Sequence, residues 1–387
     1  MIIEMPHDVE LIISRLNQNG FNAYAVGGCV RDSLMNKVPQ DWDICTSASP
    51  KEIISIFSDY KTLTIGEKHG TITVIVNHVP YEVTTFRIDG EYHDNRRPDN
   101  VEFVSDLHED LKRRDFTVNA IAYHPEEGLI DPFNGYNDIK NKIIRCVGEP
   151  DKRFGEDALR IMRALRFSAV LGFEIEDNTS KSISKNKEFL KNIAVERIRS
   201  EFEKILLSDN ISTYLEYSDI FECTFGKPSH SFTGIVTTLE KNLSHRLAAY
   251  YSDCTDTLSS ILHNLKFDKK TVLRTCRIVL NRDIEIRPDT SHLRHLISIY
   301  GYETVYDILS LRNLKEEIGQ LQNIKEKNLC CSISQLDING NDLSDFASGK
   351  QIGYILKKLL ELVITEETEN KKDALIKRAK YIKECLE

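Results

Sequence analysis

The pattern of apolar residues changes near Gly148, and this change limits the folds open to the chain more than any other feature. Upstream of it, short runs typical of strands alternate with stretches typical of helices. The strand-like runs are NAYAV (22–26), WDICT (42–46), TITVIV (71–76) and YEVTTF (81–86). The last two flank residues 77–80 and predict a hairpin. Downstream of Gly148, apolar residues recur every three or four positions, so the sequence predicts an α/β head followed by an all-helical remainder.

Length and composition restrict the class of protein. The chain has 387 residues, more than one hydrophobic core usually organises, and its 41% hydrophobic and 29% charged residues are typical of globular proteins. The N-terminal MIIEMPHDVELII is acidic where a secretory signal would be basic, and no uncharged run of about 18 apolar residues occurs. Nine scattered cysteines form no CxxC pair. We therefore predict a cytoplasmic protein with reduced thiols and no membrane partner.

The charge balance limits how the chain can meet nucleic acid. Its 51 basic and 60 acidic residues give a formal net charge of −9, which argues against attraction over the whole surface. Any RNA would have to meet a local basic patch, and its binding should weaken as the salt concentration rises.

Asp41 and Asp43 form a D-x-D pattern around Trp42. Residues two apart in a strand point to the same face, so both carboxylates are expected to converge while Trp42 turns toward the core. Two carboxylates at this separation suit Mg²⁺, which keeps coordination sites for water and phosphate. Because the pattern is common, a solvated strand end is the alternative for this motif taken alone.

A double glycine lies upstream of these aspartates. The segment GGCVRD (27–32) follows the apolar run AYAV and opens a predicted helix. Gly28 has no side chain to cover the backbone N–H groups near the N-terminus of the helix, where an anion can bind. The planar guanidinium of Arg31 can donate two hydrogen bonds to phosphate oxygens. Alone, the segment could be a structural turn with Arg31 and Asp32 in a surface pair. Together with the D-x-D pattern, it indicates a triphosphate site beside a metal site.

Six motifs follow one another through the first half of the chain. They are GGCVRD (27–32), DWDICT (41–46), RRDFTVNAIAY (113–123), DPFNGYNDIKNKIIRCVG (131–148), EDALRIMRALRF (156–167) and ERIRSEFEKIL (196–206). In this order they resemble the class II transfer-RNA nucleotidyltransferases, which include CCA-adding enzymes and their bacterial poly(A) polymerase relatives. A weaker similarity continues through DINGNDL (337–343) and IGYILKKLLELV to the C-terminus.

The resemblance implies a fold and a division of the chain into parts. The expected fold is an α/β head of nucleotidyltransferase type, a small mixed sheet with helices, followed by an all-helical neck, body and tail. The parts are a catalytic head (1–140), a neck with nucleotide-base recognition (141–206), a body (207–315) and a tail that binds tRNA (316–387). The basic residues of the tail could contact RNA phosphates or lie on an ordinary solvated helix. They are Lys371, Lys372, Lys377, Arg378, Lys380 and Lys383.

Adjacent arginines precede Asp115, and Asn119 follows four residues later. Arginines near a triphosphate neutralise its charge and orient the leaving pyrophosphate. The resemblance implies that Arg114 contacts the nucleotide, while Asp115 and Asn119 are expected to brace the site. A surface ion-pair cluster is the alternative.

The segment EDALRIMRALRF predicts a helix on which Asp157 and Arg160 are neighbours. A carboxylate can accept a hydrogen bond from the amino group that cytosine and adenine carry, and a guanidinium can donate to a ring nitrogen or carbonyl. Uracil and guanine present a carbonyl in place of that amino group. The resemblance implies that Asp157 and Arg160 select CTP and ATP, with Arg163 and Arg166 as further nucleotide contacts. A helix with internal ion pairs is the alternative.

Three further features have secondary roles. Residues 196–206 predict a helix that supports the base-reading helix. Glu82, in the hairpin, is either a third acidic group or a supporting hydrogen-bond partner. The polar loop 87–100 matches in position a loop that A-adding members of the family possess and CC-only relatives lack.

The resemblance thus implies a CCA-adding tRNA nucleotidyltransferase. Two Mg²⁺ ions on Asp41 and Asp43 would promote in-line transfer from CTP and ATP to a tRNA 3′ end, without a nucleic-acid template or an obligate protein partner. An A-adding enzyme or a bacterial poly(A) polymerase is the nearest alternative, although such polymerases carry an extended basic C-terminal region. A non-catalytic RNA-binding protein is a third possibility.

Overall fold

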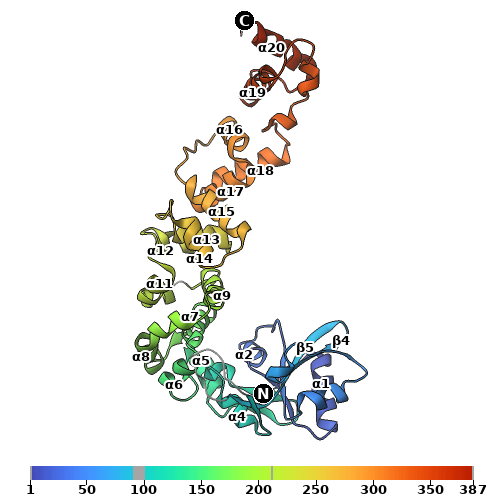
Figure 1. The fold of residues 1–387 in the computed structure, drawn as a ribbon, viewed down its shortest axis with the longest axis vertical. Coiled ribbons are helices and arrows are strands. Elements are labelled where there is room, and N and C mark those ends of the chain that lie inside the picture. Colours follow the sequence, from blue (N-terminus) through green and yellow to red (C-terminus); the bar gives the residue numbers. More distant parts are fainter. Residues whose placement is uncertain (1, 90–100, 211, 386–387) are drawn as a thin grey trace. The chain divides into compact units, whose positions relative to one another are not determined.

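The computed structural model describes residues 2–89, 101–210 and 212–385 (Figure 1). The chain divides into two compact units, Met1–Lys227 and Pro228–Glu387. Among the described residues, the first unit contains all the strands and the second contains helices only. The predicted α/β head is therefore confirmed, and the remainder is mostly helical; the expectation that it is all-helical was wrong for two short strands in the predicted neck, at residues 143–144 and 174–175. None of the described helices has both the length and the apolar character needed to span a bilayer.

A mixed seven-stranded sheet forms the core of the first unit, with the strand order β3-β4-β5-β2-β1-β8-β9. Its strands are β1 (Ala23–Val26), β2 (Asp43–Thr46), β3 (Lys61–Leu63), β4 (Thr71–Val76), β5 (Val79–Thr85), β8 (Ala122–His124) and β9 (Gly128–Ile130). The β2–β5 pair is parallel, and the neighbouring pairs are antiparallel. The predicted hairpin is confirmed: β4 and β5 are joined by Asn77 and His78, both with positive φ, as in a tight hairpin turn.

Helices α1 (His7–Gln18) and α3 (Pro50–Ile56) pack on this sheet. The buried residues of α1 recur every three or four positions, which gives the helix one apolar face. Helix α3 begins with a capping box, in which the Ser49 side chain accepts from the Glu52 N–H and the Glu52 carboxylate accepts from the Ser49 N–H. Helix α1 thus covers β1 and β2, and α3 covers β4 and β5.

The remaining helices of the first unit follow the sheet or lie between its strands. They are α2 (Gly28–Leu34), α4 (Leu107–Lys112), α5 (Gly135–Asn141), α6 (Pro150–Glu156), α7 (Leu159–Leu171), α8 (Asp177–Asn186), α9 (Val195–Leu206), α10 (Ser212–Glu216) and α11 (Ser218–Phe225). Helix α9 packs against α7 with Ile198, Phe202, Ile205 and Leu206 buried, as the sequence predicts.

Four short strands were not predicted. They are β6 (Arg87–Asp89), β7 (Val101–Phe103), β10 (Ile143–Ile144) and β11 (Glu174–Ile175). Strand β6 begins the segment 87–100 that was expected to be a loop, and it pairs with β7, an arrangement that the polar composition did not indicate. The rest of that segment, 90–100, lies outside the described residues.

The second unit is built from nine described α-helices. They are α12 (Phe232–Ile235), α13 (Leu243–Tyr250), α14 (Leu258–Asn264), α15 (Lys269–Leu280), α16 (Thr290–Tyr300), α17 (Tyr302–Leu311), α18 (Lys315–Glu326), α19 (Lys350–Ile364) and α20 (Lys372–Glu384). One apolar cluster joins α16, α17 and α18, and another joins α19 and α20. Helix α19 has an apolar face that includes its buried Ile355, Leu359 and Val363.

Arg294 of α16 connects these two clusters. The residue is 4% exposed. Its Nε and Nη2 donate to the carbonyl oxygen of Cys330 at 3.1 and 2.9 Å. Nη2 also donates to the carbonyl of Val363 at 3.0 Å, and Nη1 to that of Ile364 at 3.2 Å. The last carbonyls of a helix have no partner within it, so Arg294 supplies donors to the end of α19.

Replacing Arg294 with methionine is expected to destabilise the second unit by about 2 kcal/mol, because buried carbonyls lose their donors. Amide hydrogen exchange across residues 350–379 should become faster than in the unchanged chain. The exposed Arg287, replaced in the same way, is the control. Equal protection in the two variants would contradict the role given to Arg294.

Candidate functional site

A glycine turn leads from β1 into α2. Gly27 has a φ of +82°, and a Cβ on this residue would lie 2.9 Å from Nη1 of Arg114. Both the positive φ and the close approach require glycine. Gly28 begins α2, so the strand, double glycine and helix occur in the predicted order. The turn thus allows the Arg114 guanidinium to lie directly against it.

Asp41 and Asp43 flank Trp42 at the start of β2. The sequence analysis placed both aspartates inside one strand, which was wrong for Asp41, because the strand begins only at Asp43. Both aspartates are exposed, whereas Trp42 is 8% exposed and turns into the core as predicted.

Glu82 of β5 lies opposite Asp43 in the parallel β2–β5 pair. Desolvation raises the pKa of Asp43, and the charges of Glu82 and Asp41 raise it as well, while Arg114 acts in the other direction. The three carboxylates therefore concentrate negative charge at this point of the sheet, and an ionised Asp43 is stabilised by a nearby cation.

The donor set fits a divalent ion that arrives with a phosphate ligand. Within residues 2–89, 101–210 and 212–385, no three His, Cys, Asp or Glu side chains are grouped so as to hold a metal by themselves. Mg²⁺ is commonly held by one or two carboxylates, with water and substrate phosphates completing its shell. Asp41 and Asp43 could supply such a pair.

Arg114 follows α4 and is positioned by Asp110, which is fully buried. Nη2 of Arg114 lies 3.4 Å from Oδ2 of Asp110, and Arg113 donates twice to Oδ1 at 3.0 and 2.8 Å. Burial alone would lower the pKa of Arg114, but Asp110 and Asp43 raise it. Its buried Nε has no partner among the described residues. A charged guanidinium with a spare donor beside Asp43 is suited to an anionic ligand.

Arg31 is held on two sides. Its Nη1 donates to Oδ1 of Asn119 at 2.6 Å, while its Nε and Nη2 donate to Oδ1 of Asp32 at 2.9 and 2.7 Å. Arg31 is only 9% exposed. Asn119 therefore braces Arg31. The ion pair between Arg31 and Asp32, which the sequence analysis expected if the segment were only a structural turn, is also present.

Asp157 and Arg160 lie on either side of a helix break. The prediction of one helix across residues 156–167 was wrong, because Asp157 has an extended backbone that ends α6, and its Oδ1 accepts from the Leu159 N–H at the start of α7. Oδ2 of Asp157 accepts from Nη2 of Arg197 at 3.0 Å. Nη1 of Arg160 donates to Glu156 at 2.7 Å.

Arg163 and Arg166 gather with Arg31 around the ring of Phe167. The guanidinium carbons lie 5.4, 3.8 and 5.4 Å from the ring centroid for Arg163, Arg166 and Arg31, respectively. Arg163 pairs with Asp115 at 2.5 Å, and Arg166 pairs with Glu201 of α9. Desolvation, with the nearby Arg163, lowers the pKa of Arg166. Each cation is therefore fixed before any ligand binds.

The paired carboxylates of this site predict acid sensitivity. Burial alone would raise the pKa of Asp110 and of Asp115, but the arginines outweigh it and hold both below the usual range. The stability that they contribute is complete above the unfolded value of about 4 and is lost as the pH falls through the lower folded values. Thermal unfolding between pH 6 and pH 3 should show this loss. An Asp115→Asn variant should be less stable at pH 6 and less sensitive to acid; an equal pH response would contradict the assignment.

Four residues of this network were missed in the sequence. Asp110 precedes Arg113 and Arg114 by three and four positions, and Glu156 precedes Arg160 by four, so helical spacing could have indicated both pairs. Arg197 and Glu201 of α9 gave no such signal, because their partners lie far away in sequence and meet them only through packing of α9 on α7.

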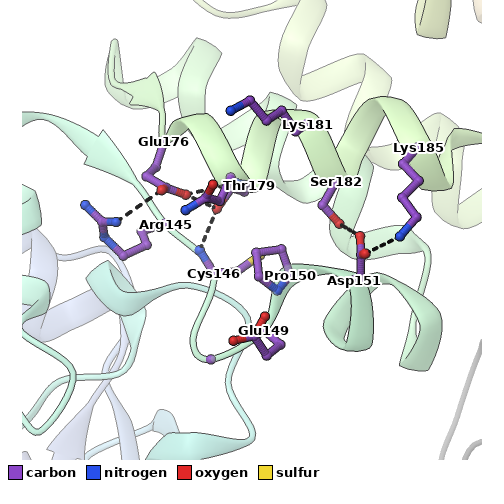
Figure 2. A pocket seen from close by; sticks show the side chains of 12 residues that line it. Arg145, Cys146, Glu149, Pro150, Asp151, Glu176, Thr179, Lys181, Ser182 and Lys185 are labelled. Carbon is purple, nitrogen blue, oxygen red and sulfur yellow. Dashed lines mark hydrogen bonds and ion pairs between the residues drawn. The ribbon is translucent and has the colours of Figure 1, made fainter.

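A polar pocket of about 380 Å³ lies among β10, α6 and α8 (Figure 2). Ser182 and Lys185 point to Asp151 and bind it, while Arg145 pairs with Glu176 at 3.4 Å. Lys185 and Arg145 are therefore each neutralised by a carboxylate of the pocket itself. None of the predicted nucleotide contacts lines this pocket, so it is separate from the candidate site.

Comparisons with known proteins match nearly the full length of the chain. Residues 23–145 match the family "Poly A polymerase head domain", residues 172–217 match "Probable RNA and SrmB- binding site of polymerase A", and residues 246–379 match a tRNA nucleotidyltransferase domain 2. The CCA-adding enzyme of Leuconostoc mesenteroides is 37% identical, with 96% of each chain covered. That of Staphylococcus haemolyticus is 36% identical, with 97% of this chain and 98% of the relative covered. The crystal structure of the Bacillus stearothermophilus CCA-adding enzyme with CTP superposes with a TM-score of 0.82 at 32% identity, with 97% of each chain covered.

Proposed function

The chain belongs to the CCA-adding enzyme family and is a nucleotidyltransferase, and from that premise we propose that it adds C, C and A to tRNA 3′ ends from CTP and ATP. Transfer occurs without a nucleic-acid template. The tRNA 3′-oxygen attacks the α-phosphorus in line, the bond between the α-phosphorus and the bridging oxygen breaks, and pyrophosphate leaves. The observation that carries the proposal is the convergence of Asp43, Arg114 and the Gly27 turn.

Asp41 and Asp43 would hold the divalent metal that enzymes of this family generally use. We assign this metal as Mg²⁺, because hard carboxylate donors with room for phosphate suit it. When bound, it supplies activation of the 3′-hydroxyl and charge neutralisation on the leaving pyrophosphate. Glu82 adds a third negative charge beside this pair.

The phosphates would be met by Arg31 and Arg114, aided by the backbone N–H groups at Gly28. Arg114 supports this assignment through its unpartnered Nε, and Arg31 through a guanidinium that Asn119 and Asp32 already hold in place. Groups that are oriented in advance cost no reorganisation when charge develops on the leaving group.

The bases would be read by Asp157 and Arg160. Asp157 accepts from the amino group of cytosine or adenine, and Arg160 donates to the neighbouring ring nitrogen or carbonyl. Arg197 orients the Asp157 carboxylate, which is supported by their 3.0 Å ion pair. Arg163 and Arg166 add positive charge on the same helix. No template strand is then needed.

The test uses the purified full chain, Mg²⁺ and three tRNA transcripts that end before CCA, after C or after CC. Each receives CTP, ATP or both, and products are resolved on a gel. Completion of all three to CCA with no further growth supports the proposal. Growth only from the CC end would indicate an A-adding enzyme, unlimited A tails a poly(A) polymerase, and no extension would overturn the proposal.

A further inference from the structure

A basic groove of about 680 Å³ lies on α15 of the second unit, beside α17. Four cationic side chains of α15 line it, and Glu303 and Asp307 of α17 face them. We call this feature the α15 groove and define it by its four cations, Lys269, Lys270, Arg274 and Arg277. A local excess of positive charge is thus present in a chain whose formal net charge is −9.

Arg274 is fixed at this groove by two buried residues. Its Nε and Nη2 donate to the Asp307 carboxylate at 2.9 and 2.6 Å. Asp307 in turn lies 2.8 Å from Nε2 of His245, which is fully buried. Nη1 of Arg274 has no partner among the described residues, and the side chain is 34% exposed. A guanidinium clamped on one edge and open on the other is suited to a phosphate.

The lysines of the groove are exposed and form no ion pair within the described part of the chain. Arg277 is also exposed, and its contact with Thr304 Oγ1 is long, at 3.5 Å. Lys270, Arg274 and Arg277 follow the three- and four-residue spacing of one helix face. A chain of phosphates can therefore meet them one after another.

Several tail lysines, in contrast, are already neutralised. Lys358 pairs with Glu361, Lys371 with Glu369 and Lys372 with Asp342, at 2.7, 2.7 and 2.6 Å. Counterion release by RNA needs cations that are available to its phosphates. In the second unit, that condition is met better on α15 than by these lysines.

We propose that the α15 groove binds the phosphate backbone of the tRNA substrate, an inference that rests on the proposed function for the identity of the RNA. Such contacts position the RNA without reading its bases. The groove therefore affects affinity for tRNA and leaves nucleotide choice unchanged.

The test compares the full chain with a Lys269→Gln/Lys270→Gln variant and with Arg274→Gln, using labelled tRNA over a series of NaCl concentrations. Loss of two phosphate contacts should weaken binding about 30-fold at 0.15 M salt and should flatten the slope of log Kd against log salt by roughly 1.5 to 2. The KM for CTP and the kcat at saturating tRNA should not change. The lysine variant decides the outcome if Arg274→Gln does not fold.

The matched control is Arg282→Gln/Arg287→Gln, which removes one partly buried and one exposed cation that are already paired with Asp283 and Glu285. A lysine variant that binds tRNA with the affinity and salt slope of this control overturns the groove assignment. Inorganic phosphate that displaces tRNA from the unchanged chain, but not from the lysine variant, at constant ionic strength supports the assignment, because the free anion then competes with the tRNA backbone for the same cations. If the unchanged chain binds tRNA through the groove but never extends it, the proposed function fails and the groove assignment stands.

Discussion

Replacing Asp43 with asparagine is expected to reduce nucleotide transfer to tRNA at least about 1000-fold, equivalent to roughly 4 kcal/mol of transition-state stabilisation. The amide keeps the shape of the carboxylate but provides a weak ligand without charge. The fold should be retained. Because Asp43 has a raised pKa in the folded state, its ionised form opposes folding at neutral pH, and the neutral variant should unfold at an equal or higher temperature.

The measurement is single-turnover extension of a tRNA transcript that lacks CCA, together with thermal unfolding of the same samples. Asp59→Asn is the matched control, because Asp59 belongs to the same unit and is an exposed carboxylate that pairs with Arg15. The control should extend tRNA at the unchanged rate. Transfer by Asp43→Asn at a near-normal rate would place the metal elsewhere.

Replacing Asp157 with asparagine is expected to reduce the discrimination of CTP against UTP about 100-fold. A site built on hydrogen bonds rejects a mismatched analogue by roughly 10⁴ to 10⁵, and the variant loses one of the two reading groups. Asparagine can rotate its amide and donate to the carbonyl of uracil, so UTP becomes acceptable. The ratio of kcat/KM for the two nucleotides on the same tRNA measures the change.

Glu149→Gln is a suitable control for this experiment. Glu149 lies at the start of α6, the helix that Asp157 ends, and lines the separate pocket of Figure 2. Its replacement should leave the CTP to UTP ratio unchanged. An Asp157→Asn variant that still rejects UTP as strongly as the unchanged chain would transfer base reading to another residue.

Features set by neighbouring residues were predictable from the sequence. The hairpin follows from two alternating runs around a short turn, and the Gly27 turn follows from a strand, two glycines and a helix in series. The apolar faces of α9 and α19 follow from helical spacing. In each case the determining contacts lie within a few residues, so the pattern carries the necessary information.

Features set by packing were not predictable. The ion pairs of Asp157 with Arg197 and of Arg166 with Glu201 join residues that are 40 and 35 positions apart. The break between α6 and α7 was missed although Asp157, whose Oδ1 accepts from the Leu159 N–H at the start of α7, is a residue type that favours helix starts. The role of each predicted site residue remains a prediction for the experiments above.

Under the proposed function, the break at Asp157 bears on how one pair of side chains meets both cytosine and adenine. On one uninterrupted helix, the rise between Asp157 and Arg160 would be fixed by the helical pitch, at about 4.5 Å. Here the carboxylate stands on extended backbone after α6 and the guanidinium stands on α7. Asp157 is nevertheless tied to the first turn of α7, because its carbonyl accepts from the Arg160 N–H at 3.0 Å and its Oδ1 accepts from the Leu159 N–H at 3.0 Å. Under the proposed function, the acceptor and the donor that read the base therefore move together with α7, while α6 can shift without separating them.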